Sequence, residues 1–405
     1  MPGVLIVAAT TGYQTRAFTE AAQRLGVPFI LATDRCHILE NPWGDNALPV
    51  RFEQPLEAAR ELADALRDRD IAGVVGIADR PALVAAFTAQ RLGLPWHPPE
   101  AAAACRDKNR MRQLFEAAGL PVPRYGLAGT VDIGFPCVLK PLGLSASRGV
   151  IRANNQTEYE AAIRRIHRII GKDDPVQVEA YIPGREFALE GLMTAGDLRT
   201  LAIFDKPDPL EGPFFEETIY VTPSRESAGI QSAIVETCSR AIRALGLSHG
   251  PIHAEMRVNE TGVYMLEIAA RPIGGLCARA LRFGDISLEE LILLHAIGRM
   301  PPNLLPPQNN LQPAHPASGV MMIAVPRAGV LEDVKGVEAA RAIAGVDDVV
   351  ITAKKGERLV PLPEGASYPG FIFASGADAR FVEGALRAAH RELRFDILAT
   401  LEQVI

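Results

Sequence analysis

The chain has 405 residues, which is enough for two to four domains of ordinary size. Apolar residues make up 48% and charged residues 22%, which is close to the globular average and excludes wholesale disorder. Forty-two Lys and Arg against 48 Asp and Glu give a net charge of −6, and this mild acidity argues against a dedicated nucleic-acid-binding protein. No apolar run approaches the ~20 residues of a membrane span, and the first residues lack the basic segment of a signal peptide.

The cysteines are odd in number, scattered, and without a CxxC pair. This pattern predicts neither a disulfide framework nor a zinc site. It fits a reducing compartment, so we expect a cytoplasmic protein. The five positions are Cys36, Cys105, Cys137, Cys238 and Cys277.

The first hundred residues alternate between apolar runs and helical patterns, which predicts a parallel sheet with helices on both faces. The loop 9–12 after the first strand lies where such sheets bind ligands. It lacks GxGxxG, so an ordinary turn is at least as good an interpretation. The predicted strands are Val4–Ala8, Val27–Ala32 and Ile71–Ile77, and the helices are Thr15–Leu25, Leu56–Arg67 and Pro81–Leu92.

Beyond residue 105 the pattern changes. A helix is predicted over Asp107–Ala118 with Asp107 as its N-cap, and strands with Gly/Pro turns dominate from about residue 131. Six prolines between Pro301 and Pro316 predict a stiff linker or a domain boundary. The other predicted helices are Gln156–Ile170, Ser227–Leu245, Val337–Ile343 and Asp378–Leu393, and the C-terminal strands are Gly319–Val325, Asp348–Thr352 and Gly370–Ala374.

The segment Ile252–Val258 alternates apolar and polar residues, as a strand with one polar face does. A three-residue loop, 260–262, with Gly262 in the left-handed position predicts a hairpin with the next strand. In that register Asn259 pairs with Val263, Glu255 with Glu267, and His253 with Ala269.

Two carboxylates facing each other across a ladder repel each other. A proton on one of them, an intervening arginine or a bridging divalent cation would relieve that repulsion. Arg257 and Arg271 lie close by and suit phosphate binding. A solvated hairpin face with both charges splayed into water is an equal alternative for this segment alone.

A short apolar strand ending at Lys140 runs into a small-residue loop, 142–150. A lysine beside free backbone N–H groups suits phosphate binding, but the loop is not the Walker pattern GxxxxGK[ST]. Taken alone, this segment is better explained as a plain surface loop.

In combination these motifs are far more specific. They resemble the ATP-grasp superfamily and, within it, the carboxylate–amine ligases similar to bacterial L-amino acid (dipeptide) ligases. The resemblance covers nearly the whole chain. In order, it rests on Asp-Lys108-Asn-Arg-Met, Val-Leu-Lys140-Pro, Ser-Ala-Ser147-Arg-Gly-Val, Glu179-Ala-Tyr-Ile-Pro-Gly-Arg-Glu186, His-Ala-Glu255 and Leu-Glu267-Ile-Ala-Ala-Arg271.

The resemblance implies an α/β and α+β protein with the ATP-grasp fold. A Rossmann-like pre-ATP-grasp domain would span residues 1–105, the ATP-grasp domain 106–312, and a small lid-like α/β domain 313–405. It also implies an ADP-forming C–N ligase that makes an amide or peptide bond through an acyl phosphate. Its partners would be a small-molecule carboxylate and an amine, with an amino acid as the expected substrate. A homodimer is possible. One alternative is a carboxylase of the biotin or aminoimidazole type, which activates bicarbonate. Another is a non-catalytic nucleotide-binding module, against which the intact Glu255, Glu267, Lys140 and Arg271 argue.

Site residues follow from the same resemblance. ATP would bind with Mg²⁺, or with Mn²⁺ as an alternative, and Glu255 and Glu267 would hold the metal. Where many members have an asparagine ligand this chain has Ala269, which leaves the number of metal ions open. Arg271, Lys140 and His253 form the catalytic group, although His253 held by hydrogen bonds in the polar face is an equal alternative. The expected ATP-binding residues are Lys108, Lys140, Ser145, Ser147, Arg148, Gly149, Glu179, Ala180, Tyr181, Ile182 and Glu186. By family position, segments 204–207 and 212–215 would border the acceptor pocket.

Overall fold

The computed structural model describes residues 2–9, 12–34, 46–300 and 314–399. Cys36, two residues of the loop 9–12 and most of the proline-rich segment lie outside the described residues. Within the described part of the chain, no helix is both long and apolar enough to cross a membrane.

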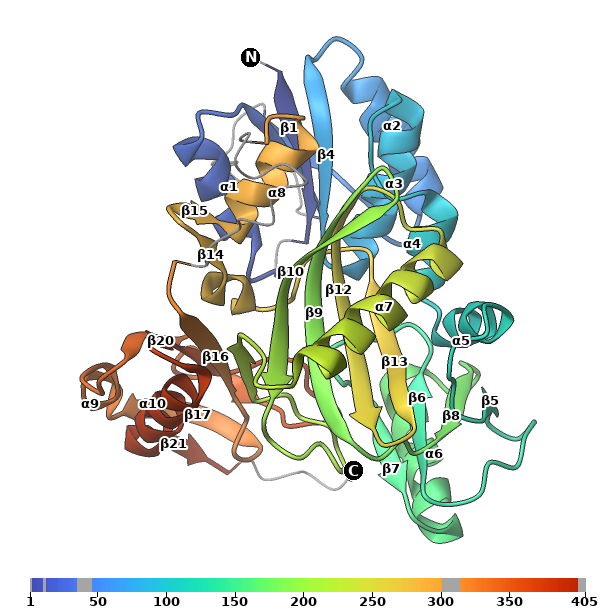
Figure 1. The fold of residues 1–405 in the computed structure, drawn as a ribbon, viewed down its shortest axis with the longest axis vertical. Helices are drawn as coiled ribbons and strands as arrows, with labels where there is room; N and C mark the ends of the chain where they lie inside the picture. The colour runs from blue at the N-terminus through green and yellow to red at the C-terminus, as the bar shows by residue number, and fades with distance from the viewer. Residues whose placement is uncertain (1, 10–11, 35–45, 301–313, 400–405) are drawn as a thin grey trace.

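The N-terminal part contains the predicted parallel sheet, in the order β3-β2-β1-β4 (Figure 1). Short β3 and α4 are additions that the sequence pattern did not reveal. The strands are β1 (Gly3–Ala8), β2 (Phe29–Thr33), β3 (Ala47–Pro49) and β4 (Ile71–Ile77), and the helices are α1 (Thr15–Arg24), α2 (Pro55–Ala65), α3 (Asp79–Leu92) and α4 (Pro99–Cys105).

A small antiparallel sheet follows, in the order β5-β8-β6-β7. Its core packs against α6 (Gln156–Ile170), whose bounds match the prediction. The helix before the sheet, α5 (Lys108–Ala117), is capped as expected, because the Asp107 carboxylate accepts from the N–H of Arg110 at 2.9 Å. The strands are β5 (Tyr125–Leu127), β6 (Cys137–Pro141), β7 (Ile151–Ala153) and β8 (Val176–Ala180).

The largest sheet has the strand order β13-β12-β9-β10-β11-β16-β20-β18, so the C-terminal strands extend the sheet that carries the hairpin. In the first view its long strands lie between the parallel sheet and the small sheet, with α7 across one face (Figure 1). The strands are β9 (Arg185–Thr194), β10 (Asp197–Lys206), β11 (Ile219–Thr222), β12 (Gly250–Asn259), β13 (Gly262–Ala269), β16 (Ala317–Ile323), β18 (Val346–Ile351) and β20 (Gly370–Gly376), and α7 is Ala228–Leu245.

The remaining elements belong to the C-terminal part and to the segment that precedes it. A three-stranded sheet in the order β19-β17-β21 and two helices complete the C-terminal part, and a short hairpin leads into α8. They are β14 (Arg282–Phe283), β15 (Ile286–Ser287), α8 (Leu288–Ala296), β17 (Gly329–Lys335), α9 (Val337–Arg341), β19 (Arg358–Leu359), α10 (Ala379–Glu392), β21 (Arg394–Leu398) and the 3₁₀ turn Cys277–Ala280.

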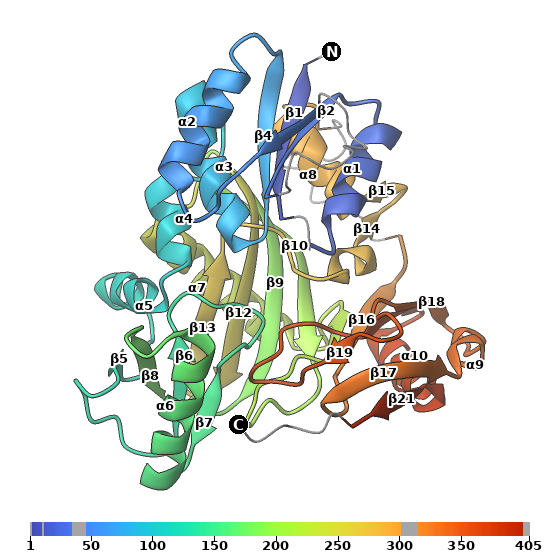
Figure 2. The same ribbon diagram turned by 180° about the vertical axis from the view of Figure 1, so that it is seen from behind.

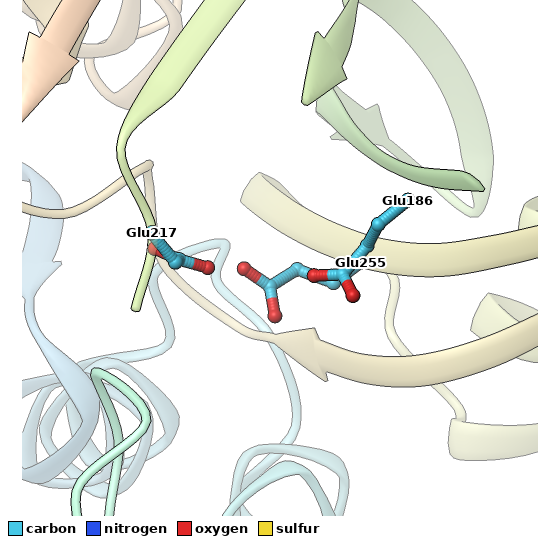
Figure 3. Close-up of side chains that lie close together, drawn as sticks. All are labelled: Glu186, Glu217 and Glu255. Carbon is cyan, nitrogen blue, oxygen red and sulfur yellow. The ribbon is translucent and has the colours of Figure 1, made fainter. Parts of the chain in front are cut away.

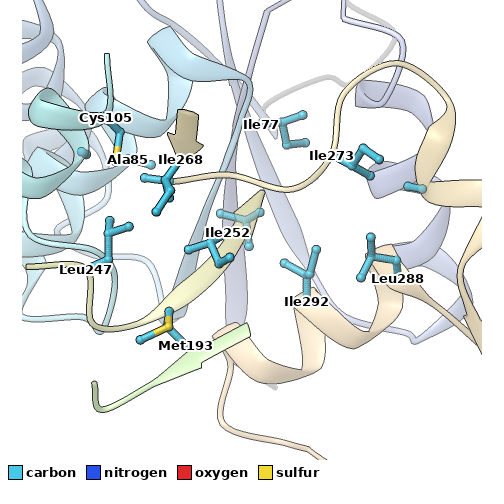
Figure 4. Packing of buried hydrophobic residues seen from close by; sticks show 14 of the residues in the cluster. Ile77, Ala85, Cys105, Met193, Leu247, Ile252, Ile268, Ile273, Leu288 and Ile292 are labelled. Carbon is cyan, nitrogen blue, oxygen red and sulfur yellow. The ribbon is translucent and has the colours of Figure 1, made fainter. Parts of the chain in front are cut away.

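One apolar core joins the N-terminal sheet to the large sheet. Figure 4 shows Ile77 at the end of β4, Ile252 of β12 and Ile292 of α8 as members of this one cluster. Although α8 comes late in the chain, it packs against α1 and β4 of the N-terminal part. Because this packing is continuous, residues 12–13, which come after β1, and residues 78–79, which follow β4, are held over the polar face of the β12–β13 hairpin.

The hairpin turn differs from the prediction. Its loop has two residues, Glu260 and Thr261, so that Asn259 pairs with Gly262 and not with Val263. A β-bulge then leaves Leu266 unpaired, and beyond it Glu255 pairs with Glu267 as expected. The predicted pairing of the two carboxylates is therefore confirmed. The one-residue change of register that brings them opposite each other comes from the bulge and not from a longer loop.

A segment of the C-terminal part reaches the small sheet. Residues 360–369, which we call the strap, lie between β19 and β20 and extend toward β6 and β7 (Figure 2). The carbonyl of Pro363 accepts from the N–H of Gly149 at 2.9 Å, and Glu364 pairs with Arg165 at 2.5 and 2.8 Å. The strap thus closes one side of the space between the sheets.

Candidate active site

A cavity of about 550 Å³ lies where the three parts meet. Of the residues predicted to form the site, Gly149 is the exception that does not line it, and its N–H donates to the carbonyl of Pro363 in the strap. Every other predicted site residue lines this cavity. They are Lys108, Lys140, Ser145, Ser147, Arg148, Glu179, Ala180, Tyr181, Ile182, Glu186, His253, Glu255, Glu267 and Arg271.

Glu179, at the end of β8, is the centre of a buried charge network. Arg112 binds both carboxylate oxygens at 2.8 and 3.2 Å, and the ammonium of Lys140 lies 2.6 Å from Oε2. Gln177 donates a further hydrogen bond at 2.5 Å. Burial alone would raise the pKa of Glu179, but the two cations outweigh it and hold the pKa at about 2. Each oxygen thus has two donors, so the side chain positions its neighbours and has little capacity left for a ligand.

The small-residue loop after Lys140 has a special backbone. Ala146 and Ser147 have φ of 54° and 53°, and Gly149 has φ of 74°. A Cβ on Gly149 would come within 2.7 Å of the Pro141 ring, so glycine is required there. The ammonium of Lys108 donates to the carbonyl of Leu144 at 2.6 Å and lies 3.2 Å from Glu267. Lys108 therefore ties the loop to the hairpin.

Three carboxylates converge beside the hairpin: Glu186, Glu217 and Glu255 (Figure 3). One oxygen of each lies within 4.8 Å of the others. The ammonium of Lys206 sits among them, 2.9 Å from Glu186, 2.8 Å from Glu217 and 3.0 Å from Glu255. A metal ion in this cluster would have to displace Lys206, so the cluster is built around an ammonium.

The pair Glu255 and Glu267, the predicted metal ligands, is a second candidate for a divalent cation. The two residues are paired across the ladder, both side chains are about one-fifth exposed, and both line the cavity. Each contacts a different lysine, Lys206 or Lys108. Burial alone would raise the pKa of Glu255, but Lys206 and His253 hold it well below its usual range, so the carboxylate is ionised and able to bind metal.

His253 is held from both sides. Its Nδ1 contacts Glu190 and its Nε2 lies 3.4 Å from Glu255. Burial would lower the pKa of His253, but Glu190 outweighs it and raises the pKa to about 9. Glu190 also accepts from the N–H of Ile273 at 3.1 Å. The alternative in which hydrogen bonds hold His253 in the polar face is therefore present in the structure.

Arg271 follows β13 and reaches the N-terminal part. Its Nε lies 2.9 Å from the carboxylate of Asp79, the first residue of α3. Burial would lower the pKa of Arg271, but Asp79 and Glu267 outweigh it and raise the pKa further. The guanidinium is thus a fixed positive charge in the cavity.

Sequence reasoning missed several cavity residues. It gave no role to Asp79, Glu217, Tyr13 or Tyr368, which come from widely separated segments. Lys206 was placed only near an acceptor pocket, although its side chain is 3% exposed and contacts three acids. The one signal for Lys206 was its place at the polar end of a long strand.

The chain matches three family models. The ATP-grasp N-terminal domain matches residues 19–96, the ATP-grasp domain matches 133–280, and the L-amino acid ligase C-terminal domain 2 matches 321–397. All the predicted site residues from Lys140 to Arg271 fall inside the ATP-grasp match.

The chain is also similar to individual proteins, two of which are ligases. An uncharacterized protein of Sinorhizobium fredii is 28% identical over 92% of this chain and 79% of its own length. Alanine–anticapsin ligase of Bacillus subtilis is 30% identical over 46% of this chain, and the matched segment spans less than half of that ligase. Among solved structures, the L-amino acid ligase of Bacillus licheniformis superposes with a TM-score of 0.81 at 25% identity, covering 98% of this chain and 99% of that one.

Proposed function

The chain belongs to the ATP-grasp superfamily and carries the C-terminal domain of the L-amino acid ligases, and on that premise we propose that it joins an amino acid to a second small molecule through an amide or peptide bond. The reaction class is ATP-dependent, ADP-forming carboxylate–amine ligation. The observation that carries the proposal is the pairing of Glu255 with Glu267 in one cavity with Lys108, Lys140 and Arg271.

The nucleotide would lie between the small sheet and the hairpin. The N–H of Ile182 has no protein acceptor among the described residues, so it is available to an adenine nitrogen. Val138, Leu266 and the ring of Tyr181 supply apolar lining there. Glu186 is fixed next to this hinge by Lys206 and Arg257, both at 2.9 Å, which suits the proposed contact with the ribose hydroxyls.

The phosphates would lie toward Lys108, Lys140 and the loop 145–148. A divalent metal ion between Glu255 and Glu267 would supply charge neutralisation on the phosphates, and we propose Mg²⁺ with Mn²⁺ as the alternative. Lys140 and Arg271 would add fixed positive charge where the γ-phosphoryl group leaves ADP.

Activation of the acid gives an acyl phosphate, which the amine attacks with loss of phosphate. Arg271 would hold the charged group, and its ion pair with Asp79 at 2.9 Å, which fixes the guanidinium, supports this role. The loop 145–149 and the strap would exclude water, which would otherwise hydrolyse the acyl phosphate.

A phosphate-release screen over pairs of amino acids and small acids, with mass spectrometry of the products, tests the proposal. We expect release to require both an acid and an amine and to yield a condensed product. Release that depends on bicarbonate with no condensed product would favour a carboxylase. The carboxylase-type neighbours, such as N5-carboxyaminoimidazole ribonucleotide synthetase of Thermotoga maritima with a TM-score of 0.72 at 17% identity, share the fold alone.

The domain boundaries, the oligomeric state and the cellular location are also proposals. The boundaries 1–105, 106–312 and 313–405 are supported by the order of the three family matches. A homodimer and a cytoplasmic location are further proposals, which light scattering of the purified protein and cell fractionation would test.

A further inference from the structure

We propose that Arg112 is a positioning residue that holds the β-bulge at Leu266 and thereby places Glu267 for metal binding. The proposal rests on the function proposed above, in which Glu255 and Glu267 hold the divalent ion. Arg112 lies on α5, and it does not line the cavity. Its action is therefore exerted through the residues that it holds.

The guanidinium of Arg112 is 1% exposed and uses all its donor nitrogens. Toward the small sheet it binds both oxygens of Glu179. Toward the hairpin, Nη1 donates to the carbonyl of Met265 at 3.1 Å and Nη2 to the carbonyl of Leu266 at 3.0 Å. One side chain thus connects the end of β8 to two consecutive carbonyls of β13.

Two consecutive carbonyls facing the same side are a mark of a bulge, since carbonyls alternate in a regular strand. The bulge lies between the pairs Met256–Met265 and Glu255–Glu267. β13 is an edge strand of the large sheet, so no further strand satisfies these carbonyls. Arg112 takes the place of that missing partner at the irregular position.

The bulge decides which face carries Glu267. Successive side chains alternate, so without the extra residue Glu255 would oppose Leu266, and Glu267 would point to the opposite face from Glu255. With the bulge, Glu267 shares the cavity with Glu255. Holding the bulge is therefore a condition for bringing the two carboxylates together.

An arginine suits this task and a lysine does not. The planar fork reaches one carboxylate and two carbonyls at once, whereas an ammonium has three donors at a single point on a flexible stem. Arg112→Lys keeps the buried charge next to Glu179 while giving up the fixed contacts to Met265 and Leu266.

Arg257 provides a matched control. It is also buried, and it binds one carboxylate, Glu186, together with two carbonyls, those of Ile182 and Leu210. Arg257→Lys therefore perturbs a similar buried network next to Ile182, while it removes no hydrogen bond to the carbonyls of Met265 and Leu266.

The first test measures Mn²⁺ binding by electron paramagnetic resonance with ADP present, beside hydrogen exchange of peptides that span residues 262–269. We expect Arg112→Lys to weaken Mn²⁺ binding about 10- to 100-fold, as loss of an outer-shell partner does, and to speed exchange in those peptides. Arg257→Lys should weaken ADP binding with normal exchange over residues 262–269. Equal changes in both variants would show general destabilisation and overturn the proposal.

Deletion of Leu266 gives a second test, which does not depend on Arg112→Lys folding well. Removing the unpaired residue leaves a regular ladder in which Glu267 keeps its face. We expect Arg112→Lys to weaken Mn²⁺ binding far less in the deletion background than in the natural chain. The same fold-loss in both backgrounds would contradict a role through the bulge. If the natural chain shows no ligase activity, the proposed function fails, but the exchange and Mn²⁺ results still decide the role of Arg112.

Discussion

The two sides of the cavity are assembled in different ways. On the side of the small sheet, Lys140 lies next to the end of β6, the loop 145–148 comes soon after that strand, and Tyr181 and Ile182 follow the end of β8. On the N-terminal side, the Tyr13 hydroxyl donates to the carbonyl of Tyr368 at 3.4 Å, and Arg271 pairs with Asp79 across 192 positions of sequence. The first side is local in sequence and uses recurring motifs, whereas the second is made by the packing of distant segments.

The hairpin carboxylates lie between the two sides, and a change there should have the largest effect. We expect Glu267→Gln to reduce turnover about a thousandfold, because it removes one anionic metal ligand while the side-chain shape is kept. Phosphate release at millimolar Mg²⁺ measures the loss, and circular dichroism checks the fold. Glu260→Gln, at the exposed turn of the same hairpin, is the control and should be near normal. Normal turnover in Glu267→Gln would refute the metal assignment.

Arg271 tests the N-terminal side. We expect Arg271→Lys to retain ATP binding, because Lys140 and the hinge are untouched, and to lose product formation about a hundredfold through the lost bidentate contacts. Calorimetry with ATP beside product formation separates the two. A parallel fall in both would make Arg271 an ATP-binding residue, and no change in either would make it a structural arginine.

Lys140 tests the side of the small sheet. We expect Lys140→Ala to raise the KM for ATP about tenfold and to lower kcat, since it removes a fixed charge from the phosphate region. Lys140→Arg should rescue only partly, because a planar fork differs in shape from a point charge. Steady-state kinetics with ATP as the variable measures this, with exposed Lys354→Ala as the control. ATP kinetics that stay unchanged would exclude the role.

The smallest expected effect is on stability and concerns a group of histidines. His97 and His295 are buried, and His295 stacks on His249. Burial lowers the pKa of His97 to about 4 and that of His295 to about 3. The unfolded chain, with values near 6.5, binds these protons first, so stability falls as the pH drops from about 6.5 toward 4. Thermal melts at several pH values measure this. His97→Gln should flatten the profile, while exposed His315→Gln should leave it unchanged; a profile that is flat in the natural chain would contradict the expectation.

The difference between the sides also explains what the sequence could reveal. The helix Gln156–Ile170 and the pairing of Glu255 with Glu267 follow from periodicity and were predicted correctly. The two-residue turn and the bulge were not, because a three-residue loop places the carboxylates in the same register. Lys206 is ordinary in sequence, and only the meeting of β9, β10, β12 and the segment before β11 shows that three carboxylates surround it.

Asp79 and Tyr368 were beyond prediction for a related reason. Asp79 follows β4 at the start of a helix, where an acidic residue is common for local reasons alone. Its pairing with Arg271 depends on the core that joins the N-terminal sheet to the large sheet, and no local pattern encodes that packing.

The strap ties the loop 145–149, which we propose binds phosphate, to the C-terminal part. Arg148 donates to the carbonyl of Glu364 at 2.9 Å, Arg165 grips the Glu364 side chain, and Tyr368 enters the same cavity a few residues later. A chimaera that exchanged the C-terminal part for that of another ligase would therefore inherit new nucleotide kinetics together with a new cavity wall. In an engineered ligase, substrate range and turnover could not be adjusted independently through this segment.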